Sequence, residues 1–86
     1  MAKNTVTQEQ IDNMIREAQV SVKTVFAKCT IVAVQLKNGF VIVESSSCVD
    51  PMNYSEAQGM AICMERIKNK LWELEGYKLQ NELGGN

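Results

Sequence analysis

The sequence predicts an α+β domain in which a short N-terminal helix, a three-stranded antiparallel β-meander and a long C-terminal helix follow one another. Apolar residues recur at helical spacing near the start and near the end of the chain, while β-branched residues dominate the segment between them. An Asn-Gly pair divides that middle segment as a hairpin turn does. We expect one domain, 1–86, with residues 1–6 disordered and residues 84–86 frayed.

The first helix is expected from about Thr7 to Ala18. Thr7 and Gln10 match a capping box, in which the threonine hydroxyl accepts from the backbone N–H three residues on and the glutamine reaches back. The apolar side chains behind this cap have the spacing of one helix face, and they are Ile11, Met14, Ile15 and Ala18.

Three strands are expected next, over residues 20–26, 30–36 and 40–43. Asn38-Gly39 favours a type I′ turn between the last two, because both residues tolerate the positive φ angles that this turn requires. The last two strands show little alternation of apolar and polar residues, which is typical of strands covered on both faces. One face would contact the helices of this chain and the other a neighbouring chain. Residues 45–48 are expected to end the hairpin.

The long helix has two candidate starts. Asp50 as N-cap with Pro51 at the first helical position is one, and a capping box of Asn53 and Glu56 is the other. Gly76 is expected to end the helix, with residues 77–83 adding another turn or two. Apolar residues spaced three and four apart form a stripe that suits self-association or packing on the chain's own sheet, and they are Ala57, Met60, Met64, Ile67, Leu71 and Leu74.

The composition disfavours several partners. A net charge of −1 and a pI near 5.3 argue against a nucleic-acid polymer or a membrane surface, and no apolar run approaches the ~20 residues that span a bilayer. We expect no secretory signal, because the first residues lead into a polar segment. The cysteines Cys29, Cys48 and Cys63 are odd in number and irregularly spaced. We therefore expect a reducing, cytosolic compartment, with the cysteines as small buried hydrophobes.

Histidine is absent, and this restricts the chemistry further. Three scattered thiols without imidazole make a poor zinc site, so we expect no metal and no other cofactor. The sequence has no Ser-His or Cys-His pair and no Gly-rich phosphate loop. We expect a binding protein, not an enzyme. Because so short a chain buries only about 60% of its unfolded surface, we also expect a homodimer or a higher oligomer.

Two cations on the long helix are candidates for ligand contacts. Arg66 and Lys70 lie one helical turn apart, so both project from one side and suit a phosphate or another anion. The alternative is a solvated helix face in which they pair with Glu65 or Glu73.

Aromatic residues offer a second set of candidates. Phe40 and Tyr54 flank a serine-rich segment, an arrangement that suits stacking on a base with hydroxyls directed to phosphate or ribose. The alternative for Phe40 is simple packing, which is the more common role of a phenylalanine at the start of a core strand. Trp72, beside the apolar stripe, is either a core residue or an interface anchor.

Three stretches resemble a family of small tailed-phage proteins typified by products of N-four-type and Sf-six-type phages. They are an Asn-Gly-Phe hairpin within residues 36–43, a Cys-Val-Asp-Pro-Met-Asn-Tyr loop within residues 47–54, and a Trp-Glu-Leu-Glu-Gly-Tyr helix end within residues 70–77. The resemblance keeps the family's order and close to its spacing over about residues 29–83. Glu44-Ser45 departs from it, because the family more often has a glycine there.

The resemblance implies a relation to the phage Thoeris anti-defence proteins. Those oligomers hold a cyclic ADP-ribose-type signal made by a bacterial TIR-domain enzyme, so that its effector is not activated. This chain would then sequester a cyclic ADP-ribose isomer or a cyclic di- or trinucleotide in the host cytoplasm without degrading it. An aromatic ring would stack on adenine, the loop would contact ribose and the helix cations would hold phosphates. The implied ligand-binding residues are Phe40, Asp50, Asn53, Tyr54, Arg66 and Lys70.

Two other functions stay open at this point. One is a protein-binding module, a host-takeover factor that docks on a bacterial protein through the surface of its long helix. The other is a structural phage component. A protein that sequesters a nucleotide needs a concave pocket with polar lining, whereas a protein-binding module needs an exposed apolar patch.

Overall fold

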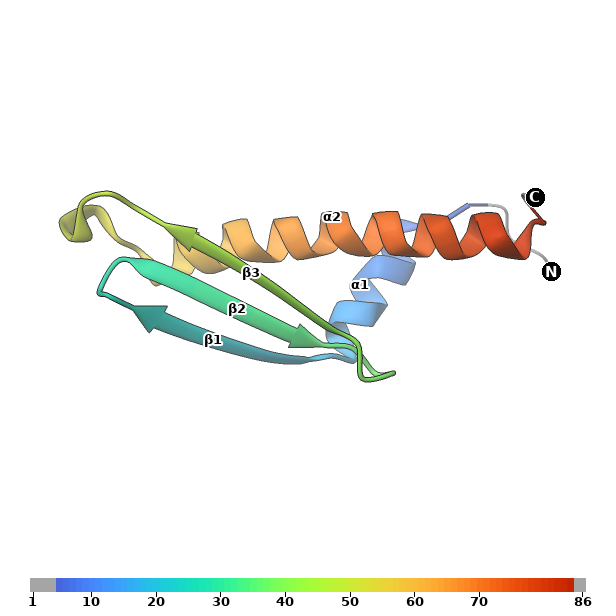
Figure 1. The fold of residues 1–86 in the computed structure, drawn as a ribbon, viewed down its shortest axis with the longest axis horizontal. Helices are drawn as coiled ribbons and strands as arrows, with labels where there is room; N and C mark the ends of the chain where they lie inside the picture. The colour runs from blue at the N-terminus through green and yellow to red at the C-terminus, as the bar shows by residue number, and fades with distance from the viewer. Residues whose placement is uncertain (1–4, 85–86) are drawn as a thin grey trace.

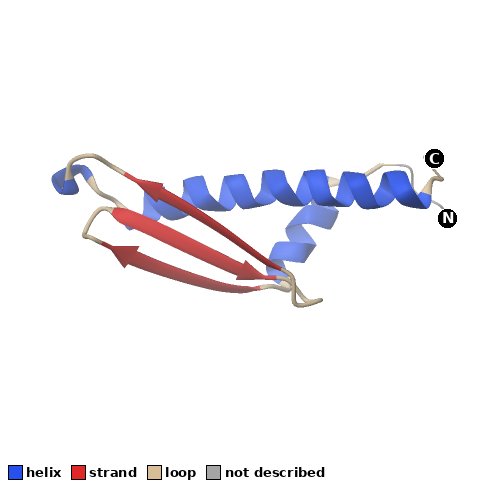
Figure 2. Cartoon of the chain, in the orientation of Figure 1, coloured by secondary structure: helices blue, strands red, loops and turns tan. Residues whose placement is uncertain are grey.

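A computed structural model describes residues 5–84, and it confirms the α+β architecture (Figures 1 and 2). The expected disorder of residues 1–4 and fraying of 85–86 lie outside the described residues. Figure 1 shows α2 running along the molecule and projecting past the sheet. The elements are α1 (Gln8–Arg16), β1 (Gln19–Val25), β2 (Cys29–Gln35), β3 (Val41–Ser47), the 3₁₀ helix η1 (Pro51–Asn53) and α2 (Glu56–Glu82).

The start of α1 follows the sequence prediction in part. The Thr7 hydroxyl accepts from the backbone N–H of Gln10 at 3.1 Å, as a capping box requires. The Gln10 side chain does not reach back; its amide donates instead to the Glu75 carboxylate of α2 at 2.7 Å. Ile11 is fully buried, and Val6, inside the segment expected to be disordered, packs against the core.

The three strands form an antiparallel meander in the order β1-β2-β3. The β2–β3 hairpin is confirmed, but its turn is not type I′, because only Gly39 has a positive φ (+95°) in it. The Gly39 N–H donates to the Leu36 carbonyl and the Leu36 N–H to the Phe40 carbonyl, both at 2.8 Å. These bonds describe a three-residue loop that ends in a glycine bulge.

A turn with two positive φ angles occurs instead between β1 and β2. Phe26 and Ala27 have φ angles of +55° and +59°, and the Lys28 N–H donates to the Val25 carbonyl. This is the pattern of a type I′ turn. It was not predicted, because neither residue favours the left-handed region, which costs roughly 1–2 kcal/mol per residue outside glycine.

The core lies between one face of the sheet and the two helices. Thr30, Val32 and Val34 alternate along β2 and are fully buried, and α2 packs on β2 and β3. The buried face of α2 repeats every four residues and consists of Gly59, Cys63, Ile67 and Leu71. The predicted stripe of α2 is therefore only half right: Ile67 and Leu71 are buried, whereas Met60 and Leu74 are more than one third exposed and Ala57 is exposed.

The boundaries of α2 differ from the prediction at both ends. Asp50 caps the short η1, and Ser55 is the N-cap of α2 through a bond from the Gln58 N–H to its hydroxyl at 3.3 Å. The helix continues through Gly76 to Glu82, because a lone glycine costs only about 1 kcal/mol in a helix that is held by packing and capping elsewhere. β3 is longer than expected and includes the serines at 45–47.

Residues 5–84 leave the second face of the sheet uncovered. Val41 and Val43 point to that face and are 51% and 52% exposed. The prediction that this chain's helices cover one face is confirmed. Coverage of the other face by a neighbouring chain stays a prediction.

Candidate functional site

Both predicted cations reach from α2 to β3. Arg66 donates from Nη1 to the Ser45 carbonyl at 2.8 Å, and Lys70 Nζ lies 2.6 Å from a Glu44 carboxylate oxygen. The Glu44 side chain is only 17% exposed, so the ion pair is partly shielded from water. Neither cation therefore pairs with Glu65 or Glu73 of its own helix, as the solvated-face alternative predicted.

Phe40 and Lys70 line one hollow. It has a volume of about 230 Å³, and β3 and α2 form its walls through Val41, Ile42, Glu73 and Leu74. The Phe40 ring is 52% exposed, because the residue follows the glycine bulge at the end of the hairpin and precedes β3. This hollow thus combines an exposed aromatic residue with the Lys70 ammonium group, the Glu73 carboxylate and apolar side chains.

Asn53 and Tyr54 line a second hollow, of about 110 Å³. It lies at the opposite end of β3, where the strand passes into η1 and α2 begins (Figure 1). Its remaining lining is mostly polar and consists of Ser46, Ser47, Cys48, Ser55, Gln58, Gly59 and Ile62. Asp50 has a structural contact nearby, since its carboxylate accepts from the Met52 N–H at 2.9 Å and thereby caps η1.

Tyr54 is fixed by a chain of hydroxyl groups that the sequence analysis did not find. Its hydroxyl lies 2.7 Å from the Thr24 hydroxyl and 2.6 Å from the Thr30 hydroxyl, and Thr24 donates to the Glu56 carboxylate at 2.6 Å. With one proton on each hydroxyl, all three bonds form when Thr30 donates to Tyr54, Tyr54 to Thr24 and Thr24 to Glu56. The chain ties β1, β2 and the start of α2 together.

A close helix-to-strand contact lies beside this chain. A Cβ atom added at Gly59 would lie 2.2 Å from the Thr30 hydroxyl oxygen, so only glycine fits where α2 crosses β2. Two features of the sequence relate to this contact: a threonine among valines in a core strand, and a glycine inside a helix. Each residue alone has an ordinary explanation, so their pairing was not predictable.

The six predicted residues do not form one site within a single chain. Phe40 pairs with Lys70 at one end of β3, and Asn53 lies beside Tyr54 at the other, with Arg66 bonded to Ser45 between them. Seven strand residues separate the two ends by roughly 20 Å. Small-molecule pockets usually measure about 300–1,000 Å³, so each hollow alone is smaller than a typical complete site.

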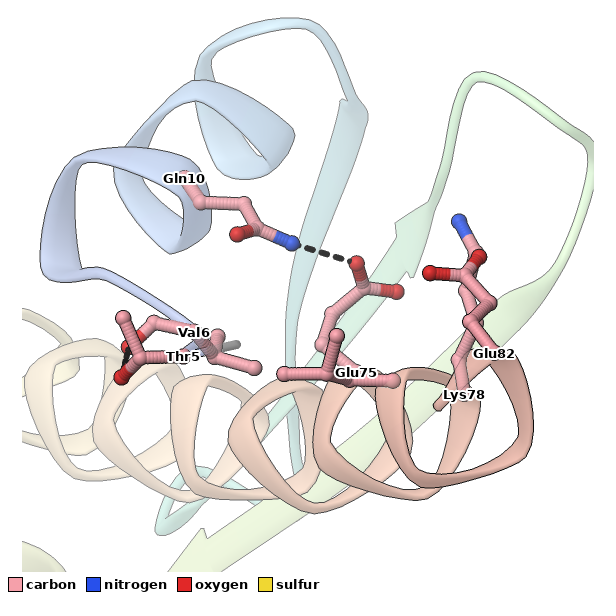
Figure 3. Close-up of a pocket in the computed structure, with 7 residues that line it drawn as sticks. Thr5, Val6, Gln10, Glu75, Lys78 and Glu82 are labelled. Atoms are coloured by element: carbon pink, nitrogen blue, oxygen red, sulfur yellow. Dashed lines mark hydrogen bonds between the residues drawn. The ribbon is translucent and has the colours of Figure 1, made fainter. Parts of the chain in front are cut away.

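A further hollow, of about 200 Å³, lies between the start of α1 and the end of α2, and it contains none of the predicted residues (Figure 3). Thr5, Val6 and Leu79 line it together with charged side chains of α2. The bond from Gln10 to Glu75 crosses it, as the dashed line in Figure 3 shows. The residues around this hollow attach α1 to α2, through the bond from Gln10 to Glu75.

Cys63 is a buried thiol that lies near Arg66. Burial raises the pKa of the Cys63 thiol above its ordinary value, and the nearby Arg66 charge offsets this only in part, so the thiol stays protonated at neutral pH. Across residues 5–84, no three His, Cys, Asp or Glu side chains gather as metal ligands would. None of the helices described has the length and apolar character needed to cross a bilayer.

Comparison with known proteins identifies the family. A family model described as "Phage protein (N4 Gp49/phage Sf6 gene 66) family" matches residues 6–83. The chain belongs to this family. The match includes α1, the whole sheet, both β3 hollows and all of α2, so it confirms the resemblance that the hairpin, loop and helix-end motifs predicted.

Membership of the N4 Gp49/Sf6 gene 66 family makes this a small phage protein. Searches of curated proteins and of solved structures gave no match. The features that bear on function are the two hollows and Arg66, which lies between them.

Proposed function

We propose that this phage protein is an anti-defence protein that binds a cyclic ADP-ribose-type or cyclic oligonucleotide signal and holds it intact in the host cytoplasm. The observation that carries the proposal is the hollow of Phe40 and Lys70. An exposed ring beside a cation matches a nucleotide, which presents a flat base and an anionic phosphate within one molecule.

The neighbouring groups support the same ligand class. Arg66 uses one of its five N–H donors on Ser45, and the guanidinium fork has others that suit phosphate oxygens. The hollow of Asn53 and Tyr54 adds serine hydroxyls and an amide, which are the groups that bind ribose hydroxyls. These groups offer stacking, charge and hydrogen bonds, and a protein that only holds its ligand needs nothing more.

The size of the hollows supports sites that are completed between copies. A cyclic ADP-ribose isomer contains an adenine, riboses and a diphosphate, and hollows of about 230 and 110 Å³ each fall below the usual range for a ligand of this size. A second copy that supplies the missing wall would enclose the ligand. We therefore include a homodimer or higher oligomer in the proposal.

A capture-and-release assay tests the proposed function. The purified protein is incubated with cyclic ADP-ribose isomers and with cyclic di- and trinucleotides, filtered to remove unbound compound, and heated to denature it. We expect one compound to be retained on filtration and recovered unchanged after heating. Retention of none of them would contradict binding, and loss of the compound after heating would contradict intact storage.

Two phenylalanines provide a matched pair of variants for this assay. Phe40→Ala should lower retention at least tenfold, because it removes the stacking ring without disturbing the core. Phe26→Ala removes the other phenylalanine, which is 87% exposed at the opposite end of the sheet, and should leave retention unchanged. Equal effects of the two substitutions would contradict a site at Phe40.

A protein-binding module that acts through α2 is a second candidate. Tyr77 lies in the C-terminal part of α2 and Leu83 directly follows the helix, and they are 70% and 53% exposed. The C-terminal end of α2 projects past the sheet (Figure 1). Exposed apolar side chains on a projecting helix suit docking into a groove of another protein. Under this alternative, Tyr77→Ala would abolish function in infected cells. If the protein instead sequesters a nucleotide, the same substitution would leave nucleotide retention intact.

A further inference from the structure

The two edges of the sheet differ in how their backbone groups are satisfied. The bond from the Leu36 N–H to the Phe40 carbonyl shows which β3 residues point their backbone groups to β2: Phe40, Ile42, Glu44 and Ser46 do so, and their neighbours point outward. Ser45 is one of the outward residues, and Arg66 binds its carbonyl. A side chain of α2 therefore occupies one outward carbonyl of the β3 edge.

The β1 edge has no such cover. Because alternate β2 residues bond to β3, the others bond to β1, and this leaves the N–H and carbonyl groups of Val20, Val22 and Thr24 pointing outward. Between residues 5 and 84, no group donates to or accepts from these backbone atoms. The sequence of β1 also lacks the features that discourage an edge strand from pairing with another strand. Gln19–Val25 has no proline, its register with β2 is unbroken, and Lys23 is its one charge.

The side chains of β1 are also incompletely covered. α2 packs on β2 and β3, so Val20 stays 41% exposed although it points to the core side of the sheet. A strand added beside β1 would both complete the backbone bonding and cover this apolar side chain.

We propose that β1 pairs antiparallel with β1 of a second copy about a two-fold axis at Val22, which joins two three-stranded sheets into one. This register places Val22 opposite Val22 of the partner subunit and Val20 opposite Thr24 of the partner subunit, so every outward N–H meets a carbonyl. It also places Lys23 opposite Ser21 of the partner subunit. An axis at Lys23 would bring two ammonium groups face to face, which is destabilising.

The strand itself favours a second copy as the occupant. The outward backbone groups of Val20 and Thr24 lie at equal distances on either side of Val22. The same edge can therefore serve both subunits in a symmetric, isologous contact. The pairing does not require a bound nucleotide. It therefore stands or falls separately from the proposed function.

Proline scanning of the two edges tests the pairing. Val22→Pro and Val43→Pro each remove an outward N–H that no strand of the same chain uses, and circular dichroism checks that both variants fold. Sedimentation equilibrium should give twice the chain mass of 9.6 kDa for the wild type and for Val43→Pro, and 9.6 kDa for Val22→Pro. A monomeric wild type, or a Val22→Pro protein that remains dimeric, would overturn the proposal, as would dissociation by Val43→Pro alone.

A cross-link provides the second measurement, which does not depend on tolerance of proline. Opposed residues in a hydrogen-bonded antiparallel pair have Cα atoms about 5.5 Å apart, within the range of a disulfide. Oxidised Val22→Cys should migrate as a covalent dimer on a non-reducing gel, whereas Val43→Cys and the wild type, with its native cysteines, should not. Equal cross-linking of all three proteins would contradict an axis at Val22.

Discussion

β2 and β3 lie under α2, whereas β1 and its turn extend beyond it, and the two parts of the sheet are built differently. Under the helix, buried residues meet at close range, as Gly59 meets Thr30. Beyond it, Val20 is exposed, the strand edge is open and the turn holds two residues at positive φ. The comparison suggests that the covered part determines stability and the uncovered part is available for contacts between molecules.

The largest expected effect is in the core under α2. Ile67→Ala should lower the free energy of unfolding by about 2–5 kcal/mol, because Ile67 is fully buried and its loss leaves a cavity. Ile62→Ala is the control on the same helix, since Ile62 is 41% exposed, and it should cost less than about 1 kcal/mol. Urea denaturation measures both, and equal losses would contradict the assigned helix face.

Two glycines of α2 should respond to alanine with opposite signs. Gly59→Ala should destabilise by about 1–3 kcal/mol, because its Cβ would overlap the buried Thr30 side chain. Gly76→Ala meets nothing within 4 Å and should stabilise the helix by about 0.5–1 kcal/mol. Thermal unfolding of both variants checks the signs, and stabilisation by Gly59→Ala would show that α2 and β2 are farther apart.

The hydroxyl chain should contribute a smaller amount. Tyr54→Phe leaves the buried Thr30 hydroxyl without its partner, so we expect a loss of about 1–2 kcal/mol. Tyr77→Phe removes a hydroxyl from a side chain that is 70% exposed and should change little. If chemical denaturation finds the two variants equally stable, the hydroxyl chain is not formed in solution.

The smallest effect is expected in the turn beyond α2. Ala27→Gly should stabilise the protein by up to about 1 kcal/mol, because glycine adopts the φ of +59° without steric cost, although it also makes the unfolded chain more flexible. Gly39→Ala, at a φ of +95°, is the reciprocal change and should destabilise. A destabilised Ala27→Gly protein in the same thermal assay would argue against the positive φ angle.

The sequence predicted the elements better than their contacts. Helical spacing and β-branched runs identify both helices and the strands, and the Thr7 cap and the Asn38-Gly39 hairpin follow from local chemistry. The predicted apolar stripe of α2 was wrong in part because the buried face repeats every four residues. It includes Gly59 and Cys63, which a spacing of three and four leaves out.

The sequence named candidate residues for a site but did not predict how they lie relative to one another. Phe40 and Lys70 share a hollow, as ring and cation of one site should. The distance between Phe40 and Tyr54 depends on β3 continuing through the serines, and serine has no strong preference that would reveal a strand. The bond from Arg66 to the Ser45 carbonyl at the β3 edge is a tertiary contact with no local signal.

We propose that the protein acts by holding an intact signal molecule within an assembly of two or more copies. Native mass spectrometry of the protein mixed with cyclic ADP-ribose isomers and cyclic oligonucleotides tests this most directly, because it counts chains and ligands in the same particle. We predict ions of at least two 9.6 kDa chains that carry a nucleotide of unaltered mass. The proposal would be contradicted if only single chains without nucleotide were detected, whichever ligand was added.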